Sequence, residues 1–152
     1  MPVEIERKFL VRNDIWNEAI KNESELIHQG YLMDSEGSTI RVRYTETKGT
    51  ITIKGKQIGI TRDEYEYEIP LVDAIEIFQK HCQKTLVKRR YKINNNEYLW
   101  DVDVYSGKLD GLIIAEIELK NENDRIDALP IWIGEEVTND IQFSNAFLAS
   151  KA

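Results

Sequence analysis

Acidic and basic side chains stand at alternate positions near the start of the chain. Glu4, Glu6 and Lys8 are each two residues apart. In a β-strand, residues two apart share one face, so these three side chains project together while Ile5 and Phe9 project the other way. Two carboxylates on one face offer the oxygen ligands that hard divalent cations prefer. A lysine beside them could contact an anion.

The same alternation recurs on most later strand candidates, with like charges two residues apart. Basic pairs suit phosphate, because guanidinium groups bind its oxygens bidentately. Acidic pairs suit a metal ion. The candidates are Arg41 with Arg43, Lys54 after Thr52, Arg62 followed by Glu64 and Glu66, Lys88 with Arg90, Asp101 with Asp103, and Glu116 with Glu118.

Alternation of this kind also occurs in a sheet with one solvated face. Two features favour an enclosed charged interior instead. The polar positions carry pairs of like charge rather than a mixture of Ser, Thr, Gln and Lys, and the opposite faces carry Ile, Val, Tyr, Trp and Phe throughout. Those apolar faces need a cover, which helices could supply from outside. A closed sheet of about eight strands has room inside for side chains or one small ligand.

Charges enclosed in this way need compensation. Paired carboxylates repel one another or take up a proton unless opposite charges or metals satisfy them. Magnesium typically retains waters and completes its shell with substrate phosphates. Carboxylate pairs and cationic pairs in one cavity therefore indicate a metal-assisted site for a polyphosphate, provided that the sheet closes.

The elements that would position these side chains are mostly strands. Alternation predicts strands over 3–11, 26–33, 39–46, 50–56, 61–69, 85–93, 97–105, 112–120 and 132–138. Helical spacing predicts helices over 15–21, 72–83 and 144–150, the first with Asn13 or Asp14 as its N-cap. The fold class is mainly β (α+β), as an antiparallel sheet or barrel. The absence of a linker predicts a single domain over 1–152.

Composition narrows the function classes. Hydrophobic residues make up 41% and charged residues 31%, as in a globular protein. The net charge of -7 argues against nucleic acid as the main partner. Cys82 is the only cysteine, so a reducing compartment is expected and the side chain is interpreted as a small core residue. No apolar stretch approaches the ~20 residues that span a bilayer. We expect a cytoplasmic protein with no membrane partner.

The segment from Glu4 to Lys8 resembles the E-x-E-x-K motif of the CYTH superfamily, the triphosphate tunnel metalloenzymes. That motif alone is weak, but the similarity continues in order along nearly the whole chain, through 29–32, 41–43, 52–55, 62–66, 88–90, 100–104 and 115–119. The resemblance implies an eight-stranded antiparallel β-barrel that forms a tunnel, with a charged interior and helices packed outside.

The resemblance also implies roles for matching positions. The triphosphate would be bound by Lys8, Arg41, Arg43, Lys54, Arg62, Lys88 and Arg90, although Arg62 could serve mainly as a neutralising partner. Divalent metal, Mg²⁺ or Mn²⁺, would be held by Glu4, Glu6, Asp103, Glu116 and Glu118. The residues with a catalytic role would be Lys8, which would contact phosphate or orient water, and Glu64 and Glu66, which would serve a second metal or place basic side chains. Asp101 is a weaker match, since relatives often have Glu there.

The activity that the resemblance implies is metal-dependent hydrolysis of a triphosphate, with inorganic tripolyphosphate as the leading substrate. The alternatives are a thiamine- or nucleoside-triphosphatase, a class IV-type adenylate cyclase, and a noncatalytic polyphosphate-binding module. Tyr31, Trp100 and Tyr105 could stack on an organic group, but aromatic residues on strands more often face an outer core. His28 could face the tunnel mouth or solvent. A homodimer is expected from family habit.

Overall fold

The computed structural model describes residues 2–16 and 23–152. Within these ranges it contains nine strands, two α-helices and two short 3₁₀ turns. The strands are β1 (Val3–Val11), β2 (Ser24–Asp34), β3 (Ser38–Tyr44), β4 (Gly49–Gly55), β5 (Thr61–Ile69), β6 (Lys84–Asn95), β7 (Tyr98–Tyr105), β8 (Ile113–Glu118) and β9 (Ile133–Glu136). The helical elements are α1 (Leu71–His81), η2 (Gly107–Leu109), η3 (Ile141–Phe143) and α2 (Asn145–Ala149).

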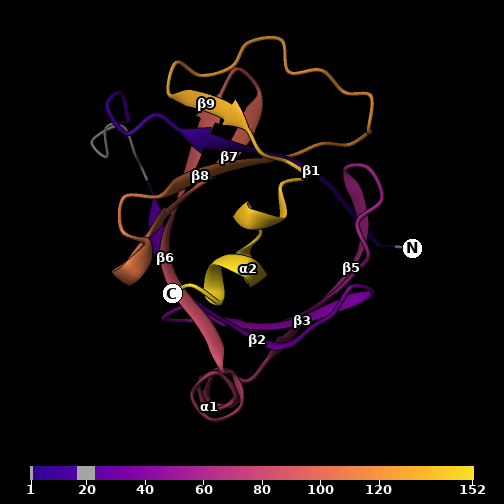
Figure 1. The fold of residues 1–152 in the computed structure, drawn as a ribbon, viewed down its shortest axis with the longest axis vertical. Helices are drawn as coiled ribbons and strands as arrows, with labels where there is room; N and C mark the ends of the chain where they lie inside the picture. The colour runs from indigo at the N-terminus through magenta and orange to yellow at the C-terminus, as the bar shows by residue number, and fades with distance from the viewer. Residues whose placement is uncertain (1, 17–22) are drawn as a thin grey trace.

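Eight of the strands form a closed antiparallel barrel, which Figure 1 shows in a view down its interior. The order around the wall is β5-β4-β3-β2-β6-β7-β8-β1, and a pairing of β1 with β5 joins the two ends. That closure consists of Val3 opposite Asp63, Glu4 opposite Arg62 and Ile5 opposite Thr61. β9 lies outside the ring and pairs with the far end of β1. The predicted mainly β fold and eight-stranded barrel are confirmed.

The predicted strands all correspond to observed ones, and those over 3–11 and 61–69 have the predicted limits. The hairpin between β6 and β7 turns at Asn96 and Glu97, whose φ angles are both positive. The predicted helix over 15–21 falls largely outside the described residues. Among the described residues no helix has the length and apolar character needed to cross a membrane.

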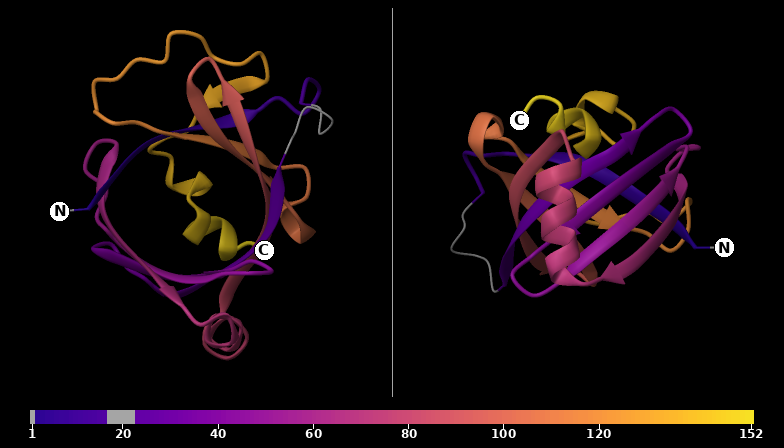
Figure 2. Two further views of the ribbon diagram at one scale, coloured as in Figure 1. Left: turned by 180° about the vertical axis from the view of Figure 1, so that it is seen from behind. Right: turned by 90° about the horizontal axis from the view of Figure 1, so that it is seen from below.

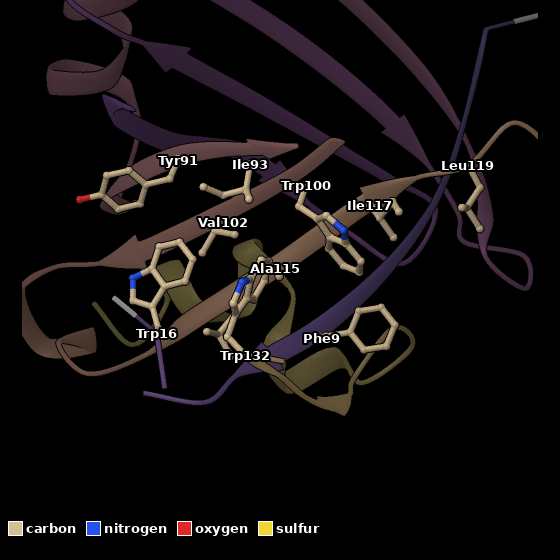
Figure 3. Close-up of a cluster of buried hydrophobic side chains, with 11 residues drawn as sticks. Phe9, Trp16, Tyr91, Ile93, Trp100, Val102, Ala115, Ile117, Leu119 and Trp132 are labelled. Atoms are coloured by element: carbon tan, nitrogen blue, oxygen red, sulfur yellow. The ribbon is translucent and has the colours of Figure 1, made fainter. Parts of the chain in front are cut away.

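The outward faces of β1, β6, β7 and β8 form the main apolar core, shown in Figure 3. Trp100 and Val102 of β7 are fully buried there. The segment between β8 and β9 returns over this face and adds Trp132, whose ring meets Trp100 edge to face at 5.9 Å. The wall of the barrel at Trp100 is therefore covered from outside.

Helix α1 covers the opposite side of the barrel, outside β2, β3 and β4 (Figure 2). Two glycines allow this close approach. A Cβ added to Gly30 would lie 2.7 Å from Cys82, and one added to Gly49 would lie 2.6 Å from Ala74. Cys82 is half-buried against this contact, in agreement with its interpretation as a small packing residue.

Helix α2 differs from the expectation that helices pack only outside. Figures 1 and 2 show it across one end of the barrel, within the outline of the ring. Leu148 and Ala149 are buried there against inward-facing side chains, namely Tyr31, Leu86, Tyr105 and Ile114. At this end the interior is apolar rather than charged, which is why a short apolar helix can occupy it.

Candidate active site

The barrel encloses a cavity of about 520 Å³ whose wall is dominated by charge. Seven basic and ten acidic side chains line it. The basic ones are Lys8, Arg41, Arg43, Lys54, Lys56, Arg62 and Arg90. The acidic ones are Glu4, Glu6, Asp34, Glu36, Glu64, Glu66, Asp101, Glu116, Glu118 and Asp140. Acid exceeds base by three formal charges, which is the difference between these two sets.

Strands β1, β7 and β8 bring half of these acids together. Glu6 lies opposite Glu118 across the β1–β8 pairing, and Glu116 lies opposite Asp101 across β7–β8. Burial, followed by the charges of Glu116 and Glu4, raises the pKa of Glu6 well above its ordinary value. Glu6 is therefore crowded enough to favour a proton in the absence of another cation. Burial also acts to raise the pKa of Glu116, but the charges of Lys8 and Arg90 outweigh it and the pKa is lowered.

A second acid pair lies where β1 meets β5. Lys54 Nζ is 2.9 Å from Glu4 Oε2 and 3.4 Å from Glu64 Oε2. Burial acts to raise the pKa of Glu4, but the charge of Lys54 and the hydrogen bonds with Glu64 and Lys54 together outweigh it, and the pKa is lowered. Burial and a hydrogen bond with Glu4 raise the pKa of Glu64 to about 7. Lys54 thus stabilises the charged form of Glu4, whereas Glu64 takes up a proton near neutral pH.

Strand β3 supplies basic groups that acids satisfy only in part. Arg41 lies 3.5 Å from Glu66 and donates to the hydroxyl of Thr52, but its buried Nε has no partner. Arg43 donates two hydrogen bonds to Oε1 of Gln29, at 2.7 and 3.0 Å. Burial, with the charges of Arg41 and Arg90, lowers the pKa of Arg43 to about 9. Among the described residues Arg43 has no carboxylate in ion-pair contact.

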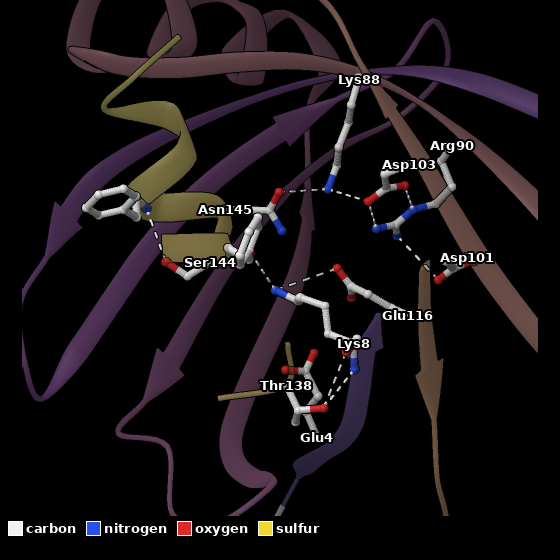
Figure 4. A network of polar contacts seen from close by, with 12 residues as sticks. Glu4, Lys8, Lys88, Arg90, Asp101, Asp103, Glu116, Thr138, Ser144 and Asn145 are labelled. Atoms are coloured by element: carbon white, nitrogen blue, oxygen red, sulfur yellow. Dashed lines mark hydrogen bonds and ion pairs between the residues drawn. The ribbon is translucent and has the colours of Figure 1, made fainter. Parts of the chain in front are cut away.

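A buried ion cluster backs the wall on β6 and β7, as Figure 4 shows. Asp103 accepts two hydrogen bonds from Arg90, at 2.8 and 2.9 Å, and lies 2.8 Å from Lys88 Nζ. The side chains of Lys88 and Asp103 are both 0% exposed. Burial acts to raise the pKa of Asp103, but the charges of Arg90 and Lys88 dominate and leave it far below its usual value. Burial lowers the pKa of Lys88 to about 7, although Asp103 opposes this shift.

The C-terminal segment is attached to this interior through its polar groups. Lys8 Nζ donates to the carbonyl of Phe143 at 3.2 Å, and the backbone N–H of Lys8 donates to Thr138 Oγ1. The side-chain oxygen of Asn145 accepts from Tyr105 at 2.6 Å and from Lys88 at 3.3 Å. Hydrogen bonds therefore join the C-terminal segment to strands β1, β6 and β7, although these segments lie far apart in the sequence.

The residues predicted from sequence mostly meet in one place. Of that set, Lys88 and Asp103 alone do not line the cavity; they lie behind its surface. Both oxygens of Asp103 contact cations, so it positions Lys88 and Arg90, and the metal-binding role predicted for it stays a prediction. Glu64 and Glu66 contact Lys54 and Arg41, which fits the expected placing of basic side chains.

Several interior residues are uncharged; from the sequence, Tyr31 and Tyr105 are candidates only for stacking on an organic group, and Gln29 has no predicted role. Gln29, Tyr31 and Tyr105 stand at the same alternate positions as the charged side chains and are buried inside. The alternation along each strand could have identified them, because they occupy the same alternate positions as the charged residues. Of the aromatic candidates, Trp100 faces the outer core. His28 lies on the outside, stacked on Tyr44 with ring centroids 4.5 Å apart.

The donor set fits a hard divalent cation, because the free groups are carboxylate oxygens in an acid-rich cavity. Glu116 Oε1 is buried without a hydrogen-bond partner, and the raised pKa of Glu6 reports uncompensated negative charge beside it. Within residues 2–16 and 23–152, however, no three acidic or histidine side chains converge as a complete metal site. A cation would therefore draw on one or two carboxylates and on a ligand that completes its shell.

Comparison with known proteins places this arrangement in a family. The CYTH domain matches residues 2–150. The chain belongs to the CYTH family. An inorganic triphosphatase of Acetivibrio thermocellus is 42% identical over 97% of this chain and 94% of its own length. One from Nitrosomonas europaea is 34% identical, with 96% of each chain covered.

Solved structures agree with the CYTH assignment. The crystal structure of an inorganic triphosphatase is similar with a TM-score of 0.67 and 31% identity, over 98% of this chain and 95% of the other. A protein from Pyrococcus horikoshii has a TM-score of 0.60 at 23% identity, over 78% of this chain and 80% of that one, and so shares the fold. Members of the triphosphate tunnel metalloenzyme family depend on a metal, and the acid-rich cavity is consistent with that dependence.

The buried cluster leads to a stability prediction. Replacing Asp103→Asn leaves Lys88 and Arg90 without their shared counter-charge in a site that water does not reach. Removing one partner of a buried ion pair costs about 3–5 kcal/mol. We expect the free energy of unfolding, measured in urea, to fall by that amount. The matched control is Asp101→Asn, which removes a 32% exposed partner of Arg90 and should cost about 1 kcal/mol or less. Equal losses of unfolding free energy in the two variants would contradict the assignment of Asp103 as the buried counter-charge of Lys88 and Arg90.

The crowded acids lead to a pH prediction for the metal-free protein. A carboxyl whose pKa rises on folding binds more protons in the folded state, so its contribution to stability is lost as pH rises through the folded pKa. For Glu64 that value is about 7, against an unfolded value near 4.3. In EDTA, the free energy of unfolding of the unaltered protein should fall between about pH 5 and 8, and that of the Glu64→Gln variant should fall less steeply. Parallel pH profiles for the two proteins would show that Glu64 does not titrate in this window.

Proposed function

We propose that this protein hydrolyses inorganic tripolyphosphate inside the barrel, in a reaction that requires a divalent cation. The observation that carries the proposal is the unpaired positive charge on β3. Arg43 is half-buried near Arg41 and Arg90, and its side-chain hydrogen bonds go to the neutral side chain of Gln29. Its lowered pKa has burial and neighbouring cations as its causes, and the negative charge of a bound anion would oppose both by favouring the charged guanidinium.

The acid excess explains why a polyanion alone is insufficient. A substrate with several negative charges would enter a cavity that already has three more acids than bases. Bringing like charges together in a poorly solvated space is unfavourable unless cations accompany them. When bound, a divalent cation would neutralise phosphate oxygens and link them to the carboxylates of the cavity. The one or two carboxylates that would hold each cation are proposed to come from Glu4, Glu6, Glu116 and Glu118, and Mg²⁺ or Mn²⁺ suits their oxygen atoms.

The proposed reaction transfers a terminal phosphoryl group to water. The attacking oxygen forms a bond to a terminal phosphorus, the P–O–P bridge breaks, and orthophosphate and pyrophosphate leave. Arg41, Arg43 and Arg90 bind and orient the phosphates, since a planar guanidinium matches their oxygens. Catalysis of this kind consists mainly of positioning and charge stabilisation.

Neighbouring carboxylates keep the basic side chains in place. Glu66 lies beside Arg41, Glu64 beside Lys54, and Asp103 between Lys88 and Arg90. Lys8 is 4.0 Å from Glu116 and projects into the same cavity, where it can contact phosphate or orient water. Arg62 lines the cavity and donates to the carbonyl of Gly55, which supports a weaker substrate role. The homodimer expected from the family stays a prediction.

The choice of substrate follows the relatives named above, which are inorganic triphosphatases. The test is release of phosphate from tripolyphosphate, thiamine triphosphate and ATP with Mg²⁺ or Mn²⁺, and with EDTA. We expect tripolyphosphate to give the highest kcat/KM and EDTA to abolish turnover. A cyclic product from ATP, or a faster organic substrate, would overturn the substrate assignment. Tight binding without turnover would identify a binding module instead.

The unpaired arginine gives a prediction of its own. Arg43→Ala should raise KM for tripolyphosphate by about 10-fold or more, because a hydrogen bond to a charged group is worth about 1.5–3 kcal/mol. The control is Arg89→Ala, which removes the neighbour of Arg90 on the opposite, outer face of β6. Its KM should match that of the unaltered protein. An unchanged KM in Arg43→Ala would remove Arg43 from the substrate site.

A further inference from the structure

The side chain of Asn145 connects the short helix α2 to the charged wall of the barrel. Its oxygen accepts from the Tyr105 hydroxyl at 2.6 Å and from Lys88 Nζ at 3.3 Å. Asn145 also lines the same cavity as Lys8 and Arg90. The residue comes from a segment that strand alternation does not describe, and no charge marks it in the sequence.

The two contacts fix which way the amide faces. A lysine amine donates hydrogen bonds, and when protonated it can only donate, so the atom of Asn145 turned toward Lys88 must be the oxygen. The amide nitrogen then points away from Lys88. Figure 4 shows it directed toward the side of the network where Lys8 and Glu116 lie. Within the described part of the chain, this nitrogen has no hydrogen-bond acceptor.

The position of Asn145 is held from behind by packing. The next turn of α2 places Leu148 and Ala149, 6% and 4% exposed, in the buried cluster with Tyr105. Ser144 caps the helix by accepting from the backbone N–H of Phe147. A donor held in this way is already oriented before a ligand arrives, so binding a ligand costs little side-chain entropy.

We propose that Asn145 is a substrate-binding residue, whose amide nitrogen donates a hydrogen bond to a phosphate oxygen at the α2 end of the cavity. This inference rests on the proposed function, because it needs a phosphate chain in the barrel. The ligand chemistry is that of a terminal phosphate, whose oxygens accept from Asn145 while Lys8 and Arg90 supply positive charge beside it. The C-terminal helix thereby contributes directly to recognition as well as to packing.

Two substitutions separate recognition from packing. Asn145→Asp keeps an oxygen for Tyr105 and Lys88 but replaces the donor with a negative oxygen. Asn145→Ala removes both donor and acceptor. If the amide only anchors α2, the Asp variant should behave like the unaltered protein and the Ala variant should be the worse of the two. If the nitrogen binds phosphate, the order for substrate affinity is reversed, because the new carboxylate repels the anion.

The measurements are KM for tripolyphosphate and the inhibition constant for orthophosphate, together with the thermal midpoint of each variant. We expect Asn145→Asp to keep its thermal midpoint and to raise both constants by at least about 10-fold, with a smaller rise in Asn145→Ala. Gln142→Glu is the matched control. It makes the same amide-to-carboxylate change on an exposed residue of the same segment that does not line the cavity. Its two constants should be unchanged.

Each outcome bears on a distinct claim. Unchanged constants in Asn145→Asp, or constants no higher than those of Asn145→Ala, would overturn the inference and leave Asn145 as a packing residue. Equal losses in Asn145→Asp and Gln142→Glu would also overturn it, because they would reflect added charge rather than a contact. If the unaltered protein neither hydrolyses tripolyphosphate nor is inhibited by orthophosphate, the proposed function and this inference fail together.

Discussion

The pairing of β1 with β5 is the constraint on which the rest of the structure depends. Three residue pairs close the sheet, and one of them places Glu4 opposite Arg62. Without this contact the charged faces would border an open, solvated sheet. With it, Glu4 comes within 2.9 Å of Lys54, and all the charged faces share one enclosed volume. A short backbone ladder thus turns surface charge into interior charge.

Enclosure makes charge balance the main energetic problem of the molecule. The barrel solves it locally in some places, as in the buried group of Asp103 with Lys88 and Arg90. Elsewhere it leaves charge uncompensated: Glu6 has a raised pKa and Arg43 a lowered one. The charged form of each group is disfavoured by its surroundings. A bound cation would stabilise the carboxylate of Glu6, and a bound anion would stabilise the guanidinium of Arg43. Under the proposed function, the bound cation and polyphosphate would remove this cost, a trade of stability for binding that is common at functional sites.

The period-two alternation in the sequence was enough to predict the strands and most of the side chains that share the cavity, whereas closure into an eight-stranded barrel was implied by the CYTH resemblance. It could not predict pairing across strands. Asp101 and Asp103 share a face and a spacing, yet Asp101 lines the cavity while Asp103 is enclosed by two cations. That difference comes from the position of each residue along the barrel, and alternation contains no such information.

The position of α2 was equally inaccessible to sequence reasoning. The pattern over 144–150 indicates a short apolar helix, and an apolar helix can pack either on an outer face or against an apolar end of the interior. The residues that decide the matter, Tyr31, Leu86 and Tyr105, lie on three separate strands. Only the closed barrel brings them together. Asn145 gained its proposed role in the same way, through contacts with β6 and β7.

The many partners of β1 also bear on how the chain reaches this state. β1 is made first, but it pairs with β5, β8 and β9, and Phe9 lies opposite Glu136 near the other end of the chain. Contacts so distant in sequence form late and slow folding, because the loop must close before they yield any stabilisation. β1 can pair with β5 once that strand has been made, but its pairing with β8 and β9 needs the later part of the sequence. The wall of the cavity is therefore completed late, and a nascent chain without β8 has no enclosed cavity.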